Sequence, residues 1–105
     1  MLTPYSPTWP EKYKKEAELI KHSLGDLVSD IQHIGSTAIP GLSAKPIIDI
    51  AVLTKSISDI DSFVTILKKI GYDYKPDMSS VERIFLRKGT PVEYHLSIAK
   101  PTHTY

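Results

Sequence analysis

The stretch that decides the fold is residues 46–53, PIIDIAVL, in which apolar and mostly β-branched side chains follow one another almost without interruption. Strands of this composition lie in the middle of a sheet that is covered on both faces. The exception is Asp49, because a carboxylate is seldom buried without a partner. The sequence therefore predicts a central strand with one carboxylate, which serves either a functional site or the capping of nearby backbone N–H groups.

Two helices are predicted, one before and one after this strand. Residues 10–24 place apolar side chains at three- and four-residue spacing, which is typical of a helix with one buried face. Pro10 suits the first turn, where its missing N–H is not needed, and Gly25 suits the end. The same spacing recurs over residues 58–70, for which Ser58 is the predicted N-cap.

The other segments are predicted to be short strands and connections. Strands are predicted over residues 27–34, 72–77, 81–88 and 92–98, an extended arm over 1–9, and a tail over 101–105. The order is helix, strand, loop, strand, helix and hairpin. This order predicts an α+β fold, a small mixed sheet with two helices packed on one side.

The composition indicates one small globular domain. The chain has 105 residues, of which 41% are hydrophobic and 24% charged, as in ordinary folded proteins. The formal net charge of +1 argues against nucleic acid as a partner, and we interpret Arg83 and Arg87 as strand-surface charges. There is no cysteine, no signal-peptide pattern and no membrane-spanning run of about 20 apolar residues, so the cytoplasm is the expected compartment. A small domain buries a small share of its surface, which favours a homodimer.

The turn after the strand predicted over 27–34 is the first candidate for a binding site. It carries Gly35, Ser36 and Thr37 in succession. Glycine lets the backbone approach a phosphate closely, and the following N–H and hydroxyl groups can donate to phosphate oxygens. Asp49 lies thirteen positions after Ser36 and would hold Mg²⁺ against those phosphates. A purely structural turn is the alternative.

Four further side chains complete the candidate site. Lys45 either pairs with Asp49 or a phosphate, or is an exposed lysine before a proline. Glu93 and His95 alternate along one predicted strand and so face the same side. Glu93 is the candidate second carboxylate for the metal, and His95 the candidate base or ligand. We also expect His33 to meet His95 across adjacent strands.

The sequence also resembles a known family. Residues 33–50, HIGSTAIPGLSAKPIIDI, closely resemble the signature of GrpB-family proteins. Residues 5–10, YSPTWP, resemble the start of that family, and Gly71 with Tyr72 resembles its glycine-tyrosine pair. The resemblance implies the nucleotidyltransferase-like fold, whose pattern is a glycine-serine turn followed by a strand bearing aspartates. It also implies that residues 1–105 form a single domain that lacks the family's usual longer C-terminal part.

The resemblance bears on activity through one departure from the pattern. Active nucleotidyltransferases carry a second acidic residue two positions after the first, where this chain has Ala51. Two-metal chemistry needs carboxylates that converge on both ions, so Asp49 and Glu93 would leave a weakened site. We therefore expect a degenerate domain that binds a nucleotide or another phosphorylated small molecule with weak or no catalysis. The alternatives are an active magnesium-dependent nucleotidyltransferase and a non-catalytic dimerising module.

Overall fold

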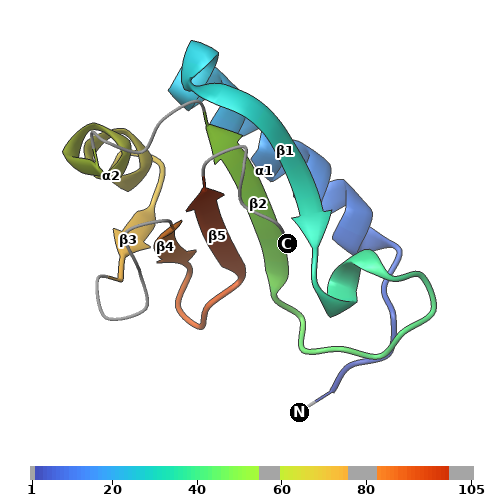
Figure 1. Ribbon diagram of the computed structural model, residues 1–105. Helices are drawn as coiled ribbons and strands as arrows, with labels where there is room; N and C mark the ends of the chain where they lie inside the picture. Colours follow the sequence, from blue (N-terminus) through green and yellow to red (C-terminus); the bar gives the residue numbers. More distant parts are fainter. Residues whose placement is uncertain (1, 55–59, 76–82, 100–105) are drawn as a thin grey trace.

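The computed structural model describes residues 2–54, 60–75 and 83–99, which form two helices and five strands (Figure 1). In chain order these are α1 (Thr8–Leu24), β1 (Val28–Ile34), β2 (Ile48–Thr54), α2 (Ile60–Lys68), β3 (Tyr72–Tyr74), β4 (Arg83–Lys88) and β5 (Tyr94–Ala99). Two short 3₁₀ helices, η1 (Gly25–Leu27) and η2 (Ser36–Ala38), flank β1. Within these ranges, neither helix has the length and apolarity needed to cross a membrane.

The strands form one mixed sheet in the order β1-β2-β5-β4-β3. β2 runs parallel to β5, and the other neighbouring pairs are antiparallel. β2 thus lies between two strands, which confirms the prediction that Asp49 is on an interior strand. The strand begins at Ile48 rather than at the predicted Pro46. Proline has no N–H to give to the ladder, and the N–H of Ile47 is used locally by the carbonyl of Lys45, at 2.7 Å.

The start of the chain differs from the extended arm predicted over residues 1–9. Helix α1 begins at Thr8, and Trp9 in its first turn is 3% exposed. An indole buries a large apolar area, and a helical position lets it reach the core from α1. The backbone groups of Thr3 and Ala44 exchange hydrogen bonds of 2.7 and 2.9 Å, which join the arm to the loop before β2. The predicted end of the helix at Gly25 is confirmed, at a φ of 57°.

Two of the predictions made from the sequence concern residues outside the described ranges. These are the Ser58 N-cap of the second helix and the tail over 101–105.

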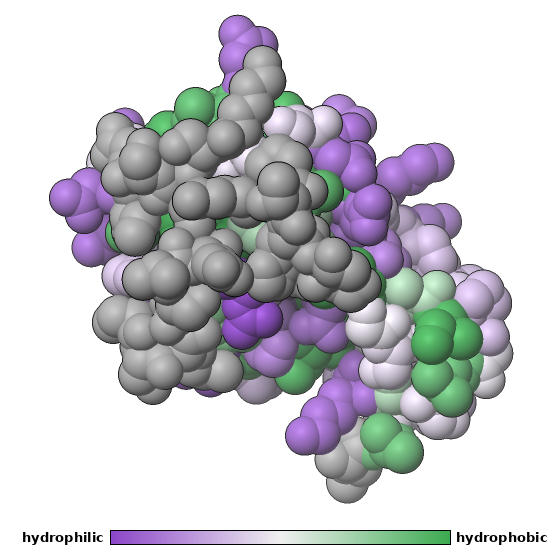
Figure 2. Space-filling model, viewed as in Figure 1, coloured by the Kyte–Doolittle hydropathy of each residue, from purple (hydrophilic) through white to green (hydrophobic). Residues whose placement is uncertain are grey.

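Large apolar side chains are exposed where the chain start meets the loop between β1 and β2. Leu2, Ile39 and Leu42 are 67%, 52% and 42% exposed. Figure 2 shows exposed hydrophobic surface on the side of the molecule where this loop lies in Figure 1.

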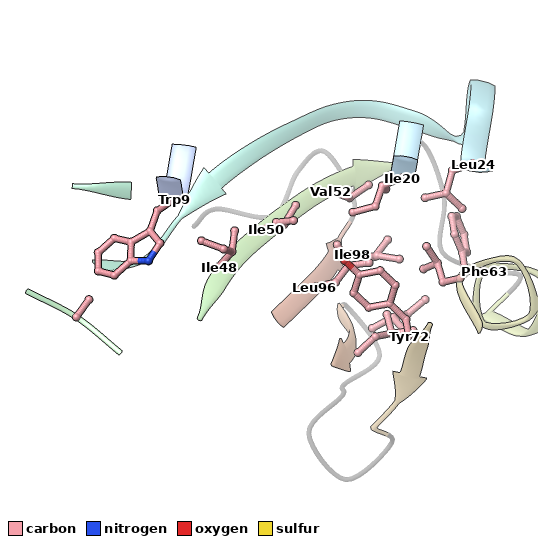
Figure 3. Close-up of a cluster of buried hydrophobic side chains, with 14 residues drawn as sticks. Trp9, Ile20, Leu24, Ile48, Ile50, Val52, Phe63, Tyr72, Leu96 and Ile98 are labelled. Atoms are coloured by element: carbon pink, nitrogen blue, oxygen red, sulfur yellow. The ribbon is translucent and has the colours of Figure 1, made fainter. Parts of the chain in front are cut away.

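The core lies between the two helices and one face of the sheet (Figure 3). Alternate residues of β2 point into it, and both helices contribute side chains to the same cluster. Its labelled members include Ile48, Ile50 and Val52 of β2, Leu96 and Ile98 of β5, Ile20 and Leu24 of α1, Phe63 of α2, and Tyr72 of β3. The prediction of two helices on one side of a mixed sheet is therefore confirmed. The residues between the core positions face the other way. We call that side the open face because neither α1 nor α2 packs on it, and Ala51, Phe85, Ser97 and Ala99 on this side are buried.

Candidate functional site

A row of charged side chains crosses the open face. Asp49 of β2 is the register partner of His95 on β5, and His95 is the partner of Arg87 on β4. Arg87 is in turn opposite Asp73 on β3. Because side chains alternate along a strand and Ile48 packs in the core, all four of these residues project from the open face. The register therefore gathers residues from four strands that are far apart in the sequence.

Asp49 and His95 form a hydrogen-bonded pair in this row. Oδ1 of Asp49 lies 3.1 Å from Nδ1 of His95, and the two side chains are 32% and 30% exposed. The edge of the His95 ring packs against Phe85, with ring centroids 5.3 Å apart. Nε2 of His95 has no hydrogen-bond partner in the described ranges. A carboxylate that holds Nδ1 orients the imidazole, so Nε2 is available to exchange a proton with a ligand.

The surroundings of Asp49 shift its protonation. Partial burial raises the pKa of Asp49, and the nearby His95 and His33 oppose that shift. Burial lowers the pKa of His33, with Asp49 opposing. A cation beside Asp49 would favour the ionised carboxylate and remove part of the burial penalty. The site is thus suited to a positive charge.

The Gly35 turn packs directly on this carboxylate. Gly35 has φ 76° and ψ −172°, a conformation that is essentially restricted to glycine. A Cβ atom added there would overlap Oδ2 of Asp49. Ser36 follows on the surface at the start of η2, whose first turn is closed by the N–H of Ala38 donating to the carbonyl of Gly35, at 3.2 Å. The backbone and the Ser36 hydroxyl therefore meet solvent next to Asp49.

Thr37, the third residue of the predicted turn, has a structural role. Its side chain is 1% exposed, and its hydroxyl donates to the carbonyl of Ile47 at 3.2 Å. The same oxygen lies 2.9 Å from Nε2 of His33, whose ring stacks on Tyr13 of α1. With the hydroxyl proton given to Ile47, Nε2 of His33 is the donor in that second bond. Thr37 thus ties β1 and α1 to the segment before β2, and its contact with a ligand stays a prediction.

Glu93 and Lys45 are not brought to Asp49 by any contact in the described part of the chain. Glu93 is exposed and precedes β5, so it lies outside the alternation that carries His95. Its side chain lies over the turn at Gly89, where an added Cβ would come within 3.2 Å of its Cγ. Lys45 is exposed. The described residues hold no group of three or more histidine, aspartate or glutamate side chains placed to bind one metal ion. A joint Asp49–Glu93 metal site stays a prediction.

The expectation that His33 meets His95 is wrong. β2 lies between β1 and β5, because β5 pairs with the other edge of β2. His33 also packs on the helix side, whereas His95 is on the open face. Ala51 does share the open face with Asp49, but it is 2% exposed. An aspartate at that position would be buried beside Asp49 and would therefore be costly to ionise.

Arg87 is the functional candidate that sequence reasoning missed, since it was interpreted as a surface charge. Its Nε atom is buried and has no hydrogen-bond partner among the residues that the structure describes. The pairing of β4 with β5 places it opposite His95. The predicted hairpin carried only a partial signal. Counting outward from its turn pairs Arg87 with Glu93, whereas the observed register pairs Arg87 with His95.

Relatives of the chain are found among curated proteins. The profile of the family described as GrpB protein matches residues 1–105. A UPF0157 protein of Halalkalibacterium halodurans is 37% identical over 98 residues, which cover 90% of this chain and 50% of that protein. A dephospho-CoA kinase of Mycolicibacterium paratuberculosis is 30% identical over 109 residues, which cover 92% of this chain and 27% of the kinase. The chain thus spans half the length of the first relative and about a quarter of the second.

The same fold is found in a solved structure. The crystal structure of conserved protein GrpB from Enterococcus faecalis matches with a TM-score of 0.91 at 35% sequence identity. The match covers 98% of this chain and 63% of that one. Since the family profile spans the whole chain and the solved structure shares its fold, this protein belongs to the GrpB family.

Proposed function

We propose that this domain binds a nucleotide or another phosphorylated small molecule at the Gly35 turn and the Asp49–His95 pair, with weak or no transferase activity. The observation that carries the proposal is the packing of Gly35 on Asp49. It puts backbone without a side chain, the exposed Ser36 and a carboxylate that is one-third exposed side by side. A phosphate can approach such a backbone closely, and a hard cation such as Mg²⁺ prefers carboxylate and phosphate oxygens.

The expected weakness of catalysis follows from the number of carboxylates. Asp49 would hold Mg²⁺ together with phosphate oxygens and water, and the ion would neutralise phosphate charge. Ala51 supplies no second ligand, and Glu93 lies over the Gly89 turn. His95, oriented by Asp49, would accept or donate a proton at Nε2. One carboxylate holds a single ion loosely, so we expect the ligand to bind without rapid nucleotidyl transfer.

The relatives agree with a phosphorylated ligand. The kinase that shares this region is named for phosphoryl transfer to dephospho-CoA, and the matched part is about a quarter of it. The absence of cysteine and of a described membrane-spanning helix fits a domain that meets such metabolites in the cytoplasm.

The test is calorimetry with Mg²⁺-ATP on the wild type, Asp49→Asn and Asp30→Asn. Asp30 is an exposed aspartate on the neighbouring strand β1 and serves as the matched control. We expect weak binding that Asp49→Asn abolishes and Asp30→Asn leaves unchanged. Equal binding by Asp49→Asn would refute the site. Rapid nucleotidyl transfer by the wild type would refute the degenerate assignment and favour the active enzyme.

A dimerising role is the second candidate, and the exposed loop favours it. Leu2, Ile39 and Leu42 are exposed, and Figure 2 shows hydrophobic surface on the side where this loop lies. Covering such a patch in a homodimer would remove it from water. Light scattering should then show a dimer that Ile39→Ser with Leu42→Ser converts to a monomer. A wild-type monomer at high concentration contradicts this role.

A further inference from the structure

A pocket lies on the open face, at the end of the charged row that is far from Gly35. It has a volume of about 280 Å³ and is lined by Asp73, Lys75, Arg87 and residues 89–92. We infer that this pocket binds a phosphate group of the ligand, with Arg87 as its principal donor. The inference rests on the proposed function, because it assigns this phosphate to the ligand that binds at the Gly35 turn.

The first argument is the unsatisfied nitrogen of Arg87. Its Nε is buried and lacks an acceptor in the described residues. A buried donor without an acceptor is unfavourable, and more so when it belongs to a charged group. A phosphate oxygen would supply the acceptor. The planar guanidinium can also offer parallel N–H groups to a phosphate, which a lysine cannot do.

The second argument is charge. Among the described residues, the charged side chains that line the pocket are Arg87, Lys75 and Asp73, and Lys75 has a further interaction within the protein. The guanidinium of Arg87 is therefore the group that favours an anion there. At the other end of the row Asp49 repels a phosphate unless a cation lies between them. The two ends of the row thus suit different parts of one ligand, a metal-bound phosphate at Asp49 and a directly held phosphate at Arg87.

The third argument is position. Arg87 is opposite His95, which is opposite Asp49. Neighbouring strands are about 4.8 Å apart, so the backbones of β2 and β4 are separated by roughly 10 Å. The long arginine side chain shortens that gap. A ligand with more than one phosphate group would reach from one end of the row to the other, passing Nε2 of His95.

The experiment uses inorganic phosphate as the probe and the Nε–H signal of Arg87 in nitrogen–proton NMR as the readout. Sodium chloride at equal ionic strength is the salt control. Arg83→Gln is the matched variant, because residue 83 is on the same strand and the same face and its loss removes the same charge. We expect the Arg87 signal to move in the wild type and in Arg83→Gln. Arg87→Gln should weaken phosphate binding by about tenfold or more, since it removes a charge-assisted bond.

Thermal unfolding gives a second measurement. Phosphate should raise the melting temperature of the wild type and of Arg83→Gln but not of Arg87→Gln, because only a folded protein with the site is stabilised by its ligand. Arg87→Lys keeps the charge without the guanidinium and should bind with intermediate strength. An Arg87→Gln protein that binds phosphate like the wild type overturns the inference.

The backbone signals of Gly35 and Ser36 separate this inference from the proposed function. With Mg²⁺-ATP as a second probe, movement at Arg87 alone supports the Arg87 pocket and refutes the Gly35 site. Movement at Gly35 and Ser36 alone overturns the Arg87 pocket and leaves the proposed function standing. Movement at both ends supports both, and movement at neither refutes both.

Discussion

The two faces of the sheet each carry a charged cluster, and the clusters differ in how far their groups are paired. On the helix side, Glu16 of α1 is 6% exposed. One of its carboxylate oxygens accepts hydrogen bonds from Nζ of Lys88 and from the hydroxyl of Tyr72, each at 2.8 Å. The Lys88 ammonium also lies over the rings of Tyr72 and Tyr94. On the open face, Asp49 and His95 are about one-third exposed, and Nε of Arg87 has no partner.

The difference separates a structural cluster from the cluster for which we propose ligand binding. Burial, followed by the charge of Glu16, raises the pKa of Tyr72, so this hydroxyl remains a donor. The helix-side groups are therefore satisfied within the protein and join α1 to β3 and β4. Asp49 and His95 on the open face stay partly in contact with solvent. Charged residues in one small sheet thus serve stability where their partners are internal, and we propose a binding role where bonding capacity is unused.

The largest expected effect is on the helix side. Glu16→Ala leaves the Lys88 ammonium and the Tyr72 hydroxyl without their acceptor, so we expect a loss of about 3 kcal/mol in the free energy of unfolding. Urea denaturation measures it. Glu18→Ala on the exposed face of the same helix is the control and should change stability by less than about 0.5 kcal/mol. Equal effects of the two variants would show that the cluster is not structural.

The next effect is at the Gly35 turn. Gly35→Ala should cost about 2 kcal/mol and abolish nucleotide binding, because the new Cβ is strained and overlaps Asp49. Gly41→Ala is the control, since Gly41 also has a positive φ but has open space around its Cβ position. It should cost about 1 kcal/mol and leave binding intact.

A double variant identifies the cause of the Gly35 effect. Adding Asp49→Ala to Gly35→Ala should recover part of the lost stability, because the overlapping carboxylate is gone. Strict additivity of the two changes would show that backbone strain alone is responsible.

The smallest effect is in the pH dependence, and it has opposite signs for two neighbours. The pKa of Asp49 is raised in the folded protein, so its contribution to stability is complete below the ordinary value of 3.8 and is lost as the pH rises through its folded pKa. The pKa of His33 is lowered, so its contribution is complete above the ordinary value of 6.5 and is lost as the pH falls below it.

Urea denaturation between pH 3 and pH 8 measures both. Asp49→Asn should remove the loss of stability that occurs on the acid side of neutrality as the pH rises. His33→Gln should flatten the curve of stability against pH below pH 6.5. Each change in the pH dependence should stay below about 1 kcal/mol, because both groups are partly solvated. A wild-type curve whose shape neither variant alters would contradict these assignments.

Much of the fold could be predicted because local patterns carry it. The apolar run around Asp49 marked an interior strand, and the spacing in residues 10–24 marked a helix that ends at Gly25. The early start of α1 was missed, since three prolines in residues 1–10 indicate an extended chain. The burial of Trp9 in the core, which favours a helix there, is visible only in the tertiary structure. The bounds of the strands moved by one to three residues, because ladder bonds rather than composition set them.

The candidate site was predictable only in part. Gly35, Ser36 and Asp49 were found from the sequence, since a glycine after one strand and a carboxylate within the next are visible without a structure. The sequence by itself therefore determined the elements and the residue types at the first end of the row. The tertiary structure alone decided that His95 meets Asp49, that Glu93 lies over a turn, and that Arg87 lies opposite His95 with its Nε atom buried. The physical reason is that the register between β2 and β5 joins residues 46 positions apart, and hydrogen bonds and core packing select that register across the whole sheet.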